Sequence, residues 1–144
     1  MIKSNNLEFR SKCPISCLLD FLGDKWSLLL IRDMVVFHKK TFKDFFSSNE
    51  KIASNILTSR LKNLEKIGII SKNSALNNKK TNIYKLTDSG LTLVPIILEM
   101  SIWSENNIFF YKKRSNPSSS SIKNKQKFIE EMQSKYIRSF DNIL

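Results

Sequence analysis

Apolar residues recur with the period of a helix through the first third of the chain. The pattern predicts a helix that begins at Pro14, which suits a first helical position, and ends at Gly23. A second helix, about Trp26 to Val36, is apolar nearly all round, which is typical of a helix buried in the middle of its domain. Thr41 is placed to cap a short third helix rich in phenylalanine.

The segment from Ile52 to Ile67 predicts a fourth helix with two unlike faces. One side is apolar; the other carries amide, hydroxyl and ammonium groups that can hydrogen-bond base edges, although an ordinary solvated face would be polar too. Arg60 projects from the apolar side, so we interpret it as structural, paired with an acid such as Asp33 or Asp44. The polar side consists of Asn55, Thr58, Ser59, Lys62 and Lys66, with Ser54 at its edge.

Two strands, about Ile69–Asn73 and Asn82–Leu86, follow this helix and are joined by a turn around Asn77–Lys80. Between Lys66 and Leu86 there are five lysines and no acid, so the tip of the hairpin is cationic. A helix that can enter the major groove, followed by a basic hairpin that can touch the neighbouring backbone, predicts a winged helix-turn-helix. The expected fold class is mainly α with a small β-hairpin (α+β).

A further long helix is predicted from a cap at Thr87 to about Asn107. Asp88 suits its first turn, and Pro95 lies inside it, where a proline should bend a helix. Apolar residues lie on more than one side, and one small domain cannot bury all of them. We therefore expect a partner subunit and long N- and C-terminal dimerisation helices.

Residues 111–121 have the composition of a linker, because they are rich in serine and lysine. Beyond it, an apolar residue at every fourth position predicts an amphipathic helix that packs back on the dimer, or else binds a partner or an anionic surface. This stripe consists of Phe128, Met132, Tyr136 and Phe140. The predicted parts are an N-terminal arm (1–12), a DNA-binding and dimerisation domain (13–110), the linker (111–121) and a C-terminal helix (122–144).

The net charge of +11 favours a polyanionic partner such as double-stranded DNA, although a lysine-rich composition can also simply keep a protein in solution. No stretch is long and apolar enough to span a bilayer, and the N-terminal segment lacks the apolar core of a signal peptide. Two cysteines and one histidine cannot supply a zinc-ligand spacing. We expect a cytoplasmic protein with no membrane partner, metal or cofactor.

Several short motifs follow one another between residues 13 and 107: CP at 13–14, GDKW at 23–26, LLIRD at 29–33, TFKDF at 41–45, EKIASNILTSRLKNLEKIGII at 50–70, YKLTDSG at 84–90 and LVPIILEMSIW at 93–103. In this order and spacing they resemble the HxlR-type winged helix-turn-helix transcriptional regulators, a MarR-like group. The resemblance implies a homodimer that binds a pseudo-palindromic operator, with Ile52–Ile67 as recognition helix and Ala75–Thr81 as wing. The chain departs from the family at His38, where glycine is common, and at the wing tip, which lacks the usual proline and acid.

The predicted DNA contacts fall into two groups. Base contacts are expected from the fourth helix, through Ser54, Asn55, Thr58, Ser59 and Lys62. Phosphate contacts are expected from the wing and from the start of the third helix, through Lys79, Lys80, Lys39, Lys40 and Thr41. The expected function is a sequence-specific DNA-binding transcriptional regulator, more a repressor than an activator.

Cys13 and Cys17 are candidate thiol sensors. Cys13 lies at an N-cap position beside Arg10 and Lys12, where the helix dipole and neighbouring cations would favour its thiolate. The resemblance adds that many family members use a cysteine here to sense oxidants or electrophiles. Since a strain-free disulfide within one helical turn is not expected, an intersubunit bond or a mixed disulfide is the better prediction. The alternative is that both are small residues in a packed interface with no redox role.

Two other functions compete with DNA binding. A thiol enzyme would need Cys13 or Cys17 beside a base such as His38, and an oxyanion site that a chain with three glycines does not offer, so no catalytic residue is expected. A protein-interaction or small-ligand-sensing regulator acting through the C-terminal helix, without thiol sensing, is compatible with DNA binding.

Overall fold

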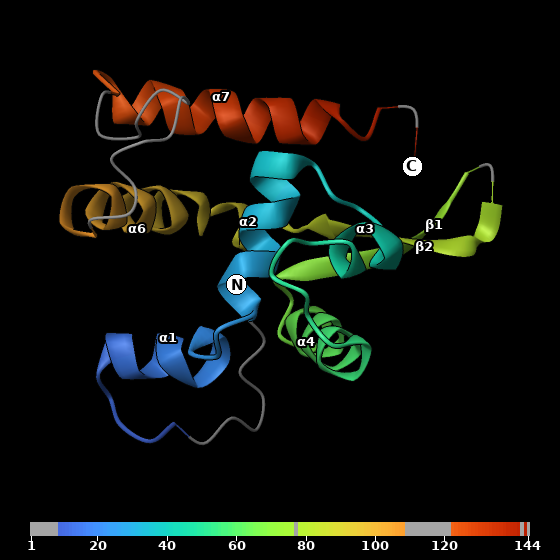
Figure 1. Cartoon of the computed structure of the whole chain (residues 1–144), viewed down its shortest axis with the longest axis horizontal. Coiled ribbons are helices and arrows are strands. Elements are labelled where there is room, and N and C mark those ends of the chain that lie inside the picture. The colour runs from blue at the N-terminus through green and yellow to red at the C-terminus, as the bar shows by residue number, and fades with distance from the viewer. Residues whose placement is uncertain (1–8, 77, 109–121, 142, 144) are drawn as a thin grey trace.

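The computed structural model describes residues 9–76, 78–108, 122–141 and 143. Within these ranges helices predominate around one antiparallel hairpin, which confirms the expected α+β class (Figure 1). No helix among them is long and apolar enough to cross a bilayer. In chain order the elements are α1 (Pro14–Leu22), α2 (Ser27–Phe37), α3 (Phe42–Phe46), α4 (Ser54–Lys66), β1 (Ile70–Ala75), β2 (Asn78–Leu86), α5 (Asp88–Leu91), α6 (Val94–Asn107) and α7 (Lys125–Arg138).

Helix α2 lies at the centre of the fold, as its apolar sequence predicted. Ile31 and Met34 are completely excluded from solvent, and the helix contacts α6, α7 and β2. It ends at His38, which adopts a left-handed backbone with a φ of 52°. Glycine adopts that conformation at least cost, so the histidine carries backbone strain at this turn.

Strands β1 and β2 form the wing, residues 70–86. Ile70 pairs with Leu86 at its base, and a bulge after Ser74 pairs Ala75 with Asn78 near its tip. The base is buried and the tip exposed. Both strands extend further toward the tip than the apolar pattern indicated, because backbone pairing continues where the side chains are polar.

The prediction of one long helix bent at Pro95 is wrong. The chain instead forms the one-turn helix α5 and then the separate helix α6, with Pro95 in the first turn of α6. A proline there removes no helical hydrogen bond, because the first N–H groups of a helix have no partner within it. The cap at Thr87 is confirmed: its Oγ1 accepts a hydrogen bond from the N–H of Gly90 (3.1 Å).

Helix α7 packs on α2 and α6 (Figure 1). Tyr136 and Phe140 are buried, and Phe128 and Met132 are half-buried against the core, so the predicted apolar stripe faces its own chain. The predicted linker, residues 111–121, and most of the predicted N-terminal arm lie outside the described residues.

Helices α1 and α6 expose large apolar side chains. Ile15 and Leu19 on α1 are 69% and 51% exposed, and Met100 and Trp103 on α6 are 49% and 63% exposed. Such faces are typical of surfaces that a second protein covers.

Candidate nucleic-acid interface

Helices α3 and α4 form the helix-turn-helix pair, and a capping box fixes the start of α3. Thr41 Oγ1 accepts a hydrogen bond from the N–H of Asp44 (3.2 Å), and the Asp44 carboxylate accepts one from the N–H of Thr41 (2.9 Å), which confirms the predicted cap. Burial raises the pKa of Asp44, but its hydrogen bonds to Thr41 and Lys40 outweigh burial and hold that pKa below its ordinary value.

Helix α4 has the two faces that its sequence predicted. On its apolar face, Leu57, Leu61 and Leu64 are buried. Thr58 donates its hydroxyl proton to the carbonyl of Ser54 (2.8 Å), so its oxygen remains an acceptor and its methyl group remains available to an outside partner. The exposed residues of the predicted reading face are Ser54, Asn55, Thr58, Ser59 and Lys62.

Arg60 lies off the reading face, but its predicted partners were wrong. Its Nη1 lies 3.4 Å from Oδ2 of Asp24, whereas Asp44 is engaged in the capping box and Asp33 binds other side chains. Asp24 also accepts two backbone N–H groups at the start of α2 (2.9 and 3.0 Å), so the pair joins α4 to α2. A helical wheel gives the direction of a side chain and not the acid that lies across from it.

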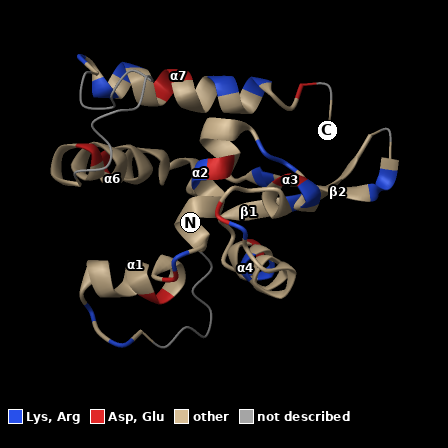
Figure 2. Ribbon diagram, in the orientation of Figure 1, with Lys and Arg blue, Asp and Glu red and all other residues tan. Residues whose placement is uncertain are grey.

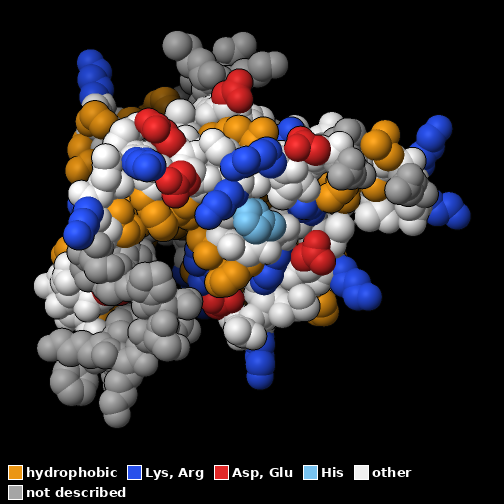
Figure 3. Space-filling model, turned by 90° about the horizontal axis from the view of Figure 1, so that it is seen from above, with side chains coloured by type: hydrophobic (Ala, Val, Ile, Leu, Met, Phe, Trp, Pro, Cys, Tyr) orange, Lys and Arg blue, Asp and Glu red, His pale blue; other side chains and the backbone are white. Residues whose placement is uncertain are grey.

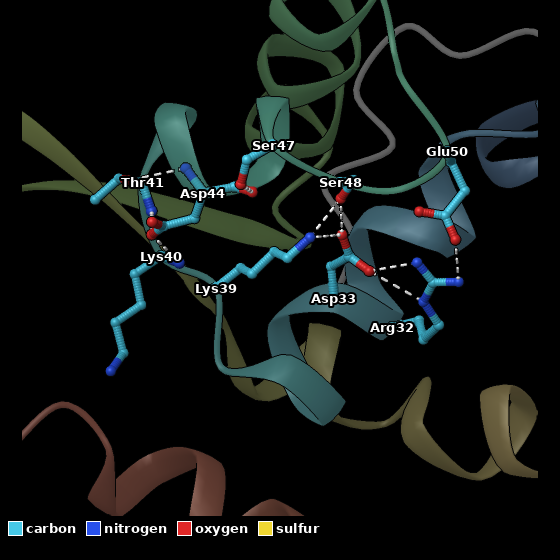
Figure 4. Close-up of polar contacts among 9 residues, drawn as sticks. All are labelled: Arg32, Asp33, Lys39, Lys40, Thr41, Asp44, Ser47, Ser48 and Glu50. Carbon is cyan, nitrogen blue, oxygen red and sulfur yellow. Dashed lines mark hydrogen bonds and ion pairs between the residues drawn. The ribbon is translucent and has the colours of Figure 1, made fainter.

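The buried carboxylate of Asp33, which the sequence suggested only as a partner of Arg60, joins α2 to the loop before α4 (Figure 4). Asp33 is 2% exposed and accepts hydrogen bonds from Arg32 Nε (3.0 Å), Lys39 Nζ (2.8 Å) and the Ser48 hydroxyl. Arg32 also binds Glu50 (2.8 Å). Burial raises the pKa of Asp33, but the bonds from Lys39, Ser48 and Arg32 outweigh burial and lower it. This Asp33 cluster holds residues 48–50, just before α4, on the core. In the sequence, the cluster was indicated only by an acidic residue inside an apolar helix.

The turn after α2 directs its lysines inward. Lys39 Nζ binds Asp33, and Lys40 Nζ donates a hydrogen bond to the carbonyl of Ser139 beyond the end of α7 (2.7 Å). Figure 4 shows the two side chains pointing in different directions. Burial lowers the pKa of Lys40. The structure thus brings Lys39, Lys40 and Thr41 together at the start of α3 but engages their polar groups within the chain.

The wing tip has the opposite character. Lys79 and Lys80 are exposed, and none of the hydrogen bonds or ion pairs among the described residues involves either ammonium group. The N–H of Lys80 donates a hydrogen bond to Oδ1 of Asn78 (3.0 Å) at the start of β2, where the sequence had predicted part of the turn. Figure 2 shows this cationic tip projecting away from the helices, and side chains of Lys or Arg extend beyond the same end of the surface in Figure 3.

Cys13, the N-cap residue of α1, and Cys17, within α1, are free thiols. Cys13 is exposed at the N-cap, whereas Cys17 is half-buried with its Sγ 3.4 Å from the carbonyl oxygen of Ser11. Arg10, one of the cations expected beside Cys13, forms an ion pair with Asp20. Among the described residues, no group of three or more His, Cys, Asp and Glu could hold a metal ion.

Comparisons with known proteins cover the helix-turn-helix pair and the wing. The family model described as HxlR-like helix-turn-helix matches residues 21–110. The HTH-type transcriptional regulator YdeP of Bacillus subtilis (strain 168) is 35% identical over 102 residues, which are 71% of this chain and 76% of YdeP. The redox regulator HypR in its oxidised form shares 34% identity and a TM-score of 0.58 over 66% of this chain and 97% of HypR. The reduced form of the transcriptional regulator YodB from B. subtilis shares 27% identity and a TM-score of 0.54 over 69% of this chain and 97% of YodB.

Proposed function

Because the chain belongs to the HxlR-like helix-turn-helix family of transcriptional regulators, which are not enzymes, we propose that it is a homodimeric repressor that binds a pseudo-palindromic operator. One observation carries the proposal: an exposed face of hydroxyl and amide groups on α4 stands beside a wing with a cationic tip. Among the described residues, the ammonium groups of Lys79 and Lys80 at this tip have no hydrogen-bond or ion-pair partner. Major-groove edges are recognised by the first kind of group and phosphates by the second.

Helix α4 is the reading element of this proposal. The amide of Asn55 can form two hydrogen bonds to adenine, the methyl group of Thr58 can contact the methyl group of thymine, and Ser59 can bond either kind of base edge. Ser54, in the first turn, and Lys62, further along the face, suit phosphates or the groove edge.

The wing supplies the phosphate contacts, through Lys79 and Lys80. We no longer assign the expected phosphate contacts to Lys39, Lys40 and Thr41, because their side-chain groups are already engaged within the chain and shape the start of α3. Affinity and salt dependence then arise mainly from the wing, and sequence choice from α4.

The exposed apolar faces of α1 and α6 support the homodimer. Burying Ile15, Leu19, Met100 and Trp103 against a second copy would remove the most exposed large apolar side chains of both helices from water. Replacing Trp103 with Lys should therefore shift the protein toward a monomer in sedimentation experiments. A native protein that sediments as a monomer would contradict the dimer.

The base-reading proposal is tested with operator DNA recovered from a genome-wide pull-down. Asn55→Ala and Ser59→Ala should each reduce discrimination between operator and random DNA by about 1–3 kcal/mol per lost base contact. Ser134→Ala, on the exposed side of α7, is the matched control and should leave discrimination unchanged. If the variants lose as much affinity for random DNA as for operator DNA, α4 does not read bases.

We also propose that Cys13 senses oxidants or electrophiles. Its exposure on α1 supports this, as does the similarity to HypR, described as a redox regulator, and to YodB, whose diamide-treated form has a solved structure. Diamide would take two electrons and two protons from Cys13 and a second thiol, either of the partner subunit or of a small molecule, and leave a disulfide. Operator binding is measured before and after diamide or methylglyoxal, for the native protein and Cys13→Ser. Identical binding in every condition would end the sensor proposal.

A regulator that acts through α7 by binding a protein or a small ligand is the competing function. Its apolar stripe would have to be available, but Tyr136 and Phe140 are buried against the same chain. Only Ile137, 45% exposed, remains as a large apolar side chain on the outer side of the described part of this helix.

A further inference from the structure

We infer that the C-terminal segment, meaning α7 with residues 139–141 and 143, is a brace that fixes the angle of the wing. Tyr136 and Phe140 are then positioning residues for the contact between wing and DNA. The inference rests on the proposed DNA binding. The segment lies beyond residues 21–110, where the family model matches, so the brace is an addition to the part of the chain that the family shares.

The brace begins at the base of the wing, on the outer edge of β2. The N–H of Leu86 donates a hydrogen bond to Oη of Tyr136 (2.8 Å), whose side chain is completely buried. Nearby, the N–H of Tyr84 donates to the carbonyl of Lys40 (2.7 Å). Strand β2 pairs with β1 on its other side, so these two contacts satisfy the edge that pairing leaves open.

The second point of contact is the ring of Phe140, which is 3% exposed. The ammonium of Lys85 on β2 lies 5.1 Å from the centre of this ring, and that of Lys40 lies 4.8 Å from it. Both cations are attracted by the electron-rich face of an aromatic ring. Lys40 Nζ also bonds the carbonyl of Ser139, so the wing, the turn after α2 and the end of α7 meet at one place.

The third contact lies near the tip. The N–H of Leu76, just past the end of β1, donates a hydrogen bond to the carbonyl of Ile143 (3.2 Å). The C-terminal segment therefore touches the wing at its base, along β2 and close to Lys79 and Lys80.

Holding the wing at several points matters because a two-stranded hairpin is only marginally stable by itself. Strands rise about 3.3 Å per residue, so a rotation of roughly 10° at the base moves the tip of a wing about 20 Å long by about 3–4 Å. That displacement exceeds the reach of a hydrogen bond to phosphate. A braced tip is presented to DNA in one orientation, and binding then loses less conformational entropy.

The first test observes the wing without DNA, by amide hydrogen exchange in the full chain. Tyr136→Phe removes only the acceptor of the Leu86 N–H, and Phe140→Leu keeps an apolar side chain but removes the ring. Each should speed exchange across residues 70–86 about tenfold, while thermal unfolding shows that the core remains folded. Ile137→Ala, which changes an exposed side chain of the same helix, is the control and should leave exchange as in the native protein. Unchanged exchange in both variants would overturn the brace.

The second test asks whether the brace acts through the wing lysines. Tyr136→Phe and Phe140→Leu are each combined with Lys79→Gln/Lys80→Gln, and affinity for a DNA duplex is measured. We expect each brace variant to weaken binding several-fold when the lysines are present and not at all when they are absent. Equal losses in both backgrounds would overturn the positioning role. If the lysine changes alone have no effect, the proposed wing contact fails together with the positioning role, whereas the exchange measurement still decides the brace by itself.

Discussion

Lys39 and Lys40, in the turn after α2, and Lys79 and Lys80, at the wing tip, are the same two-residue sequence in different surroundings. The first pair is half-buried, with one ammonium on Asp33 and the other on a backbone carbonyl. The second pair is exposed at the end of a hairpin that projects from the body (Figure 2).

The two pairs differ in whether their ammonium groups are already bound. A lysine adds to DNA affinity only where no group of the protein has already neutralised its charge. An ammonium held by a carboxylate releases few counterions when phosphate approaches, whereas a free one releases its full share. The turn lysines therefore stabilise the fold that presents α4, and the wing lysines supply the attraction to DNA.

The largest expected effect that separates the two pairs is on stability. Replacing Asp33 with Ala leaves Lys39 and Arg32 without their buried partner and should lower the free energy of unfolding by about 3–5 kcal/mol. Denaturant unfolding measures this. Lys80→Met, on the wing, should change the same free energy by less than about 0.5 kcal/mol. If Asp33→Ala and Lys80→Met lower the free energy of unfolding equally, the pairing of Asp33 with the turn lysine Lys39 does not stabilise the fold.

A second effect is the dependence of stability on pH. The pKa values of Asp33, Asp24 and Asp44 are held below their ordinary value in the folded protein. Their contribution to stability is complete above the unfolded pKa, about 3.9, and is lost as pH falls through the lower folded values. Unfolding measured from pH 7 to pH 2 should show this loss, and Asp33→Asn should reduce it. An unchanged acid limb in Asp33→Asn would contradict the buried cluster.

At alkaline pH, stability should depend on pH in the opposite direction. The reason is that burial raises the pKa of Tyr136 from 10.0 to about 12 in the folded protein. Between these values the unfolded chain loses the phenol proton more readily than the folded one, so stability should fall as pH rises through this range. Tyr136→Phe should abolish that part of the alkaline loss.

A smaller effect is expected at His38, where the turn begins. Glycine at this position would relieve the left-handed backbone, worth about 1 kcal/mol. It would also remove an imidazole ring stacked on Tyr136 with centroids 6.5 Å apart. We expect His38→Gly to raise the free energy of unfolding by up to about 1 kcal/mol. A loss of stability would show that the stacked rings outweigh the backbone strain.

Local patterns predicted the elements of this fold well. Helical spacing located α1, α2, α4 and α7, and the polar stretch between two strand-like runs located the wing, because such signals lie within a few residues of the structure they specify. Pro95 was placed wrongly because a proline inside an apolar run and a proline that starts a new helix look alike until the preceding turn is known.

Contacts between distant segments could not be predicted in the same way. The acid across from Arg60 is Asp24 and not Asp33 or Asp44, since helix packing and not spacing decides which side chains meet. The inward direction of Lys39 and Lys40 depends on Asp33 and on Ser139, which is 99 residues away from Lys40. Sequence therefore predicted which residues of α4 are exposed, but not which charged side chains pair within the chain.

The division between the wing lysines and the turn lysines is tested by the salt dependence of DNA binding, measured for two double variants. Lys79→Gln/Lys80→Gln should reduce the slope of log affinity against log salt by about 1.8, or about 0.9 for each lost phosphate contact, and leave unfolding unchanged. Lys39→Gln/Lys40→Gln should unfold more easily and flatten the slope much less, because both ammonium groups are already engaged within the chain. A native slope in the wing variant, or an equal flattening in the turn variant, would contradict the division between the two lysine pairs.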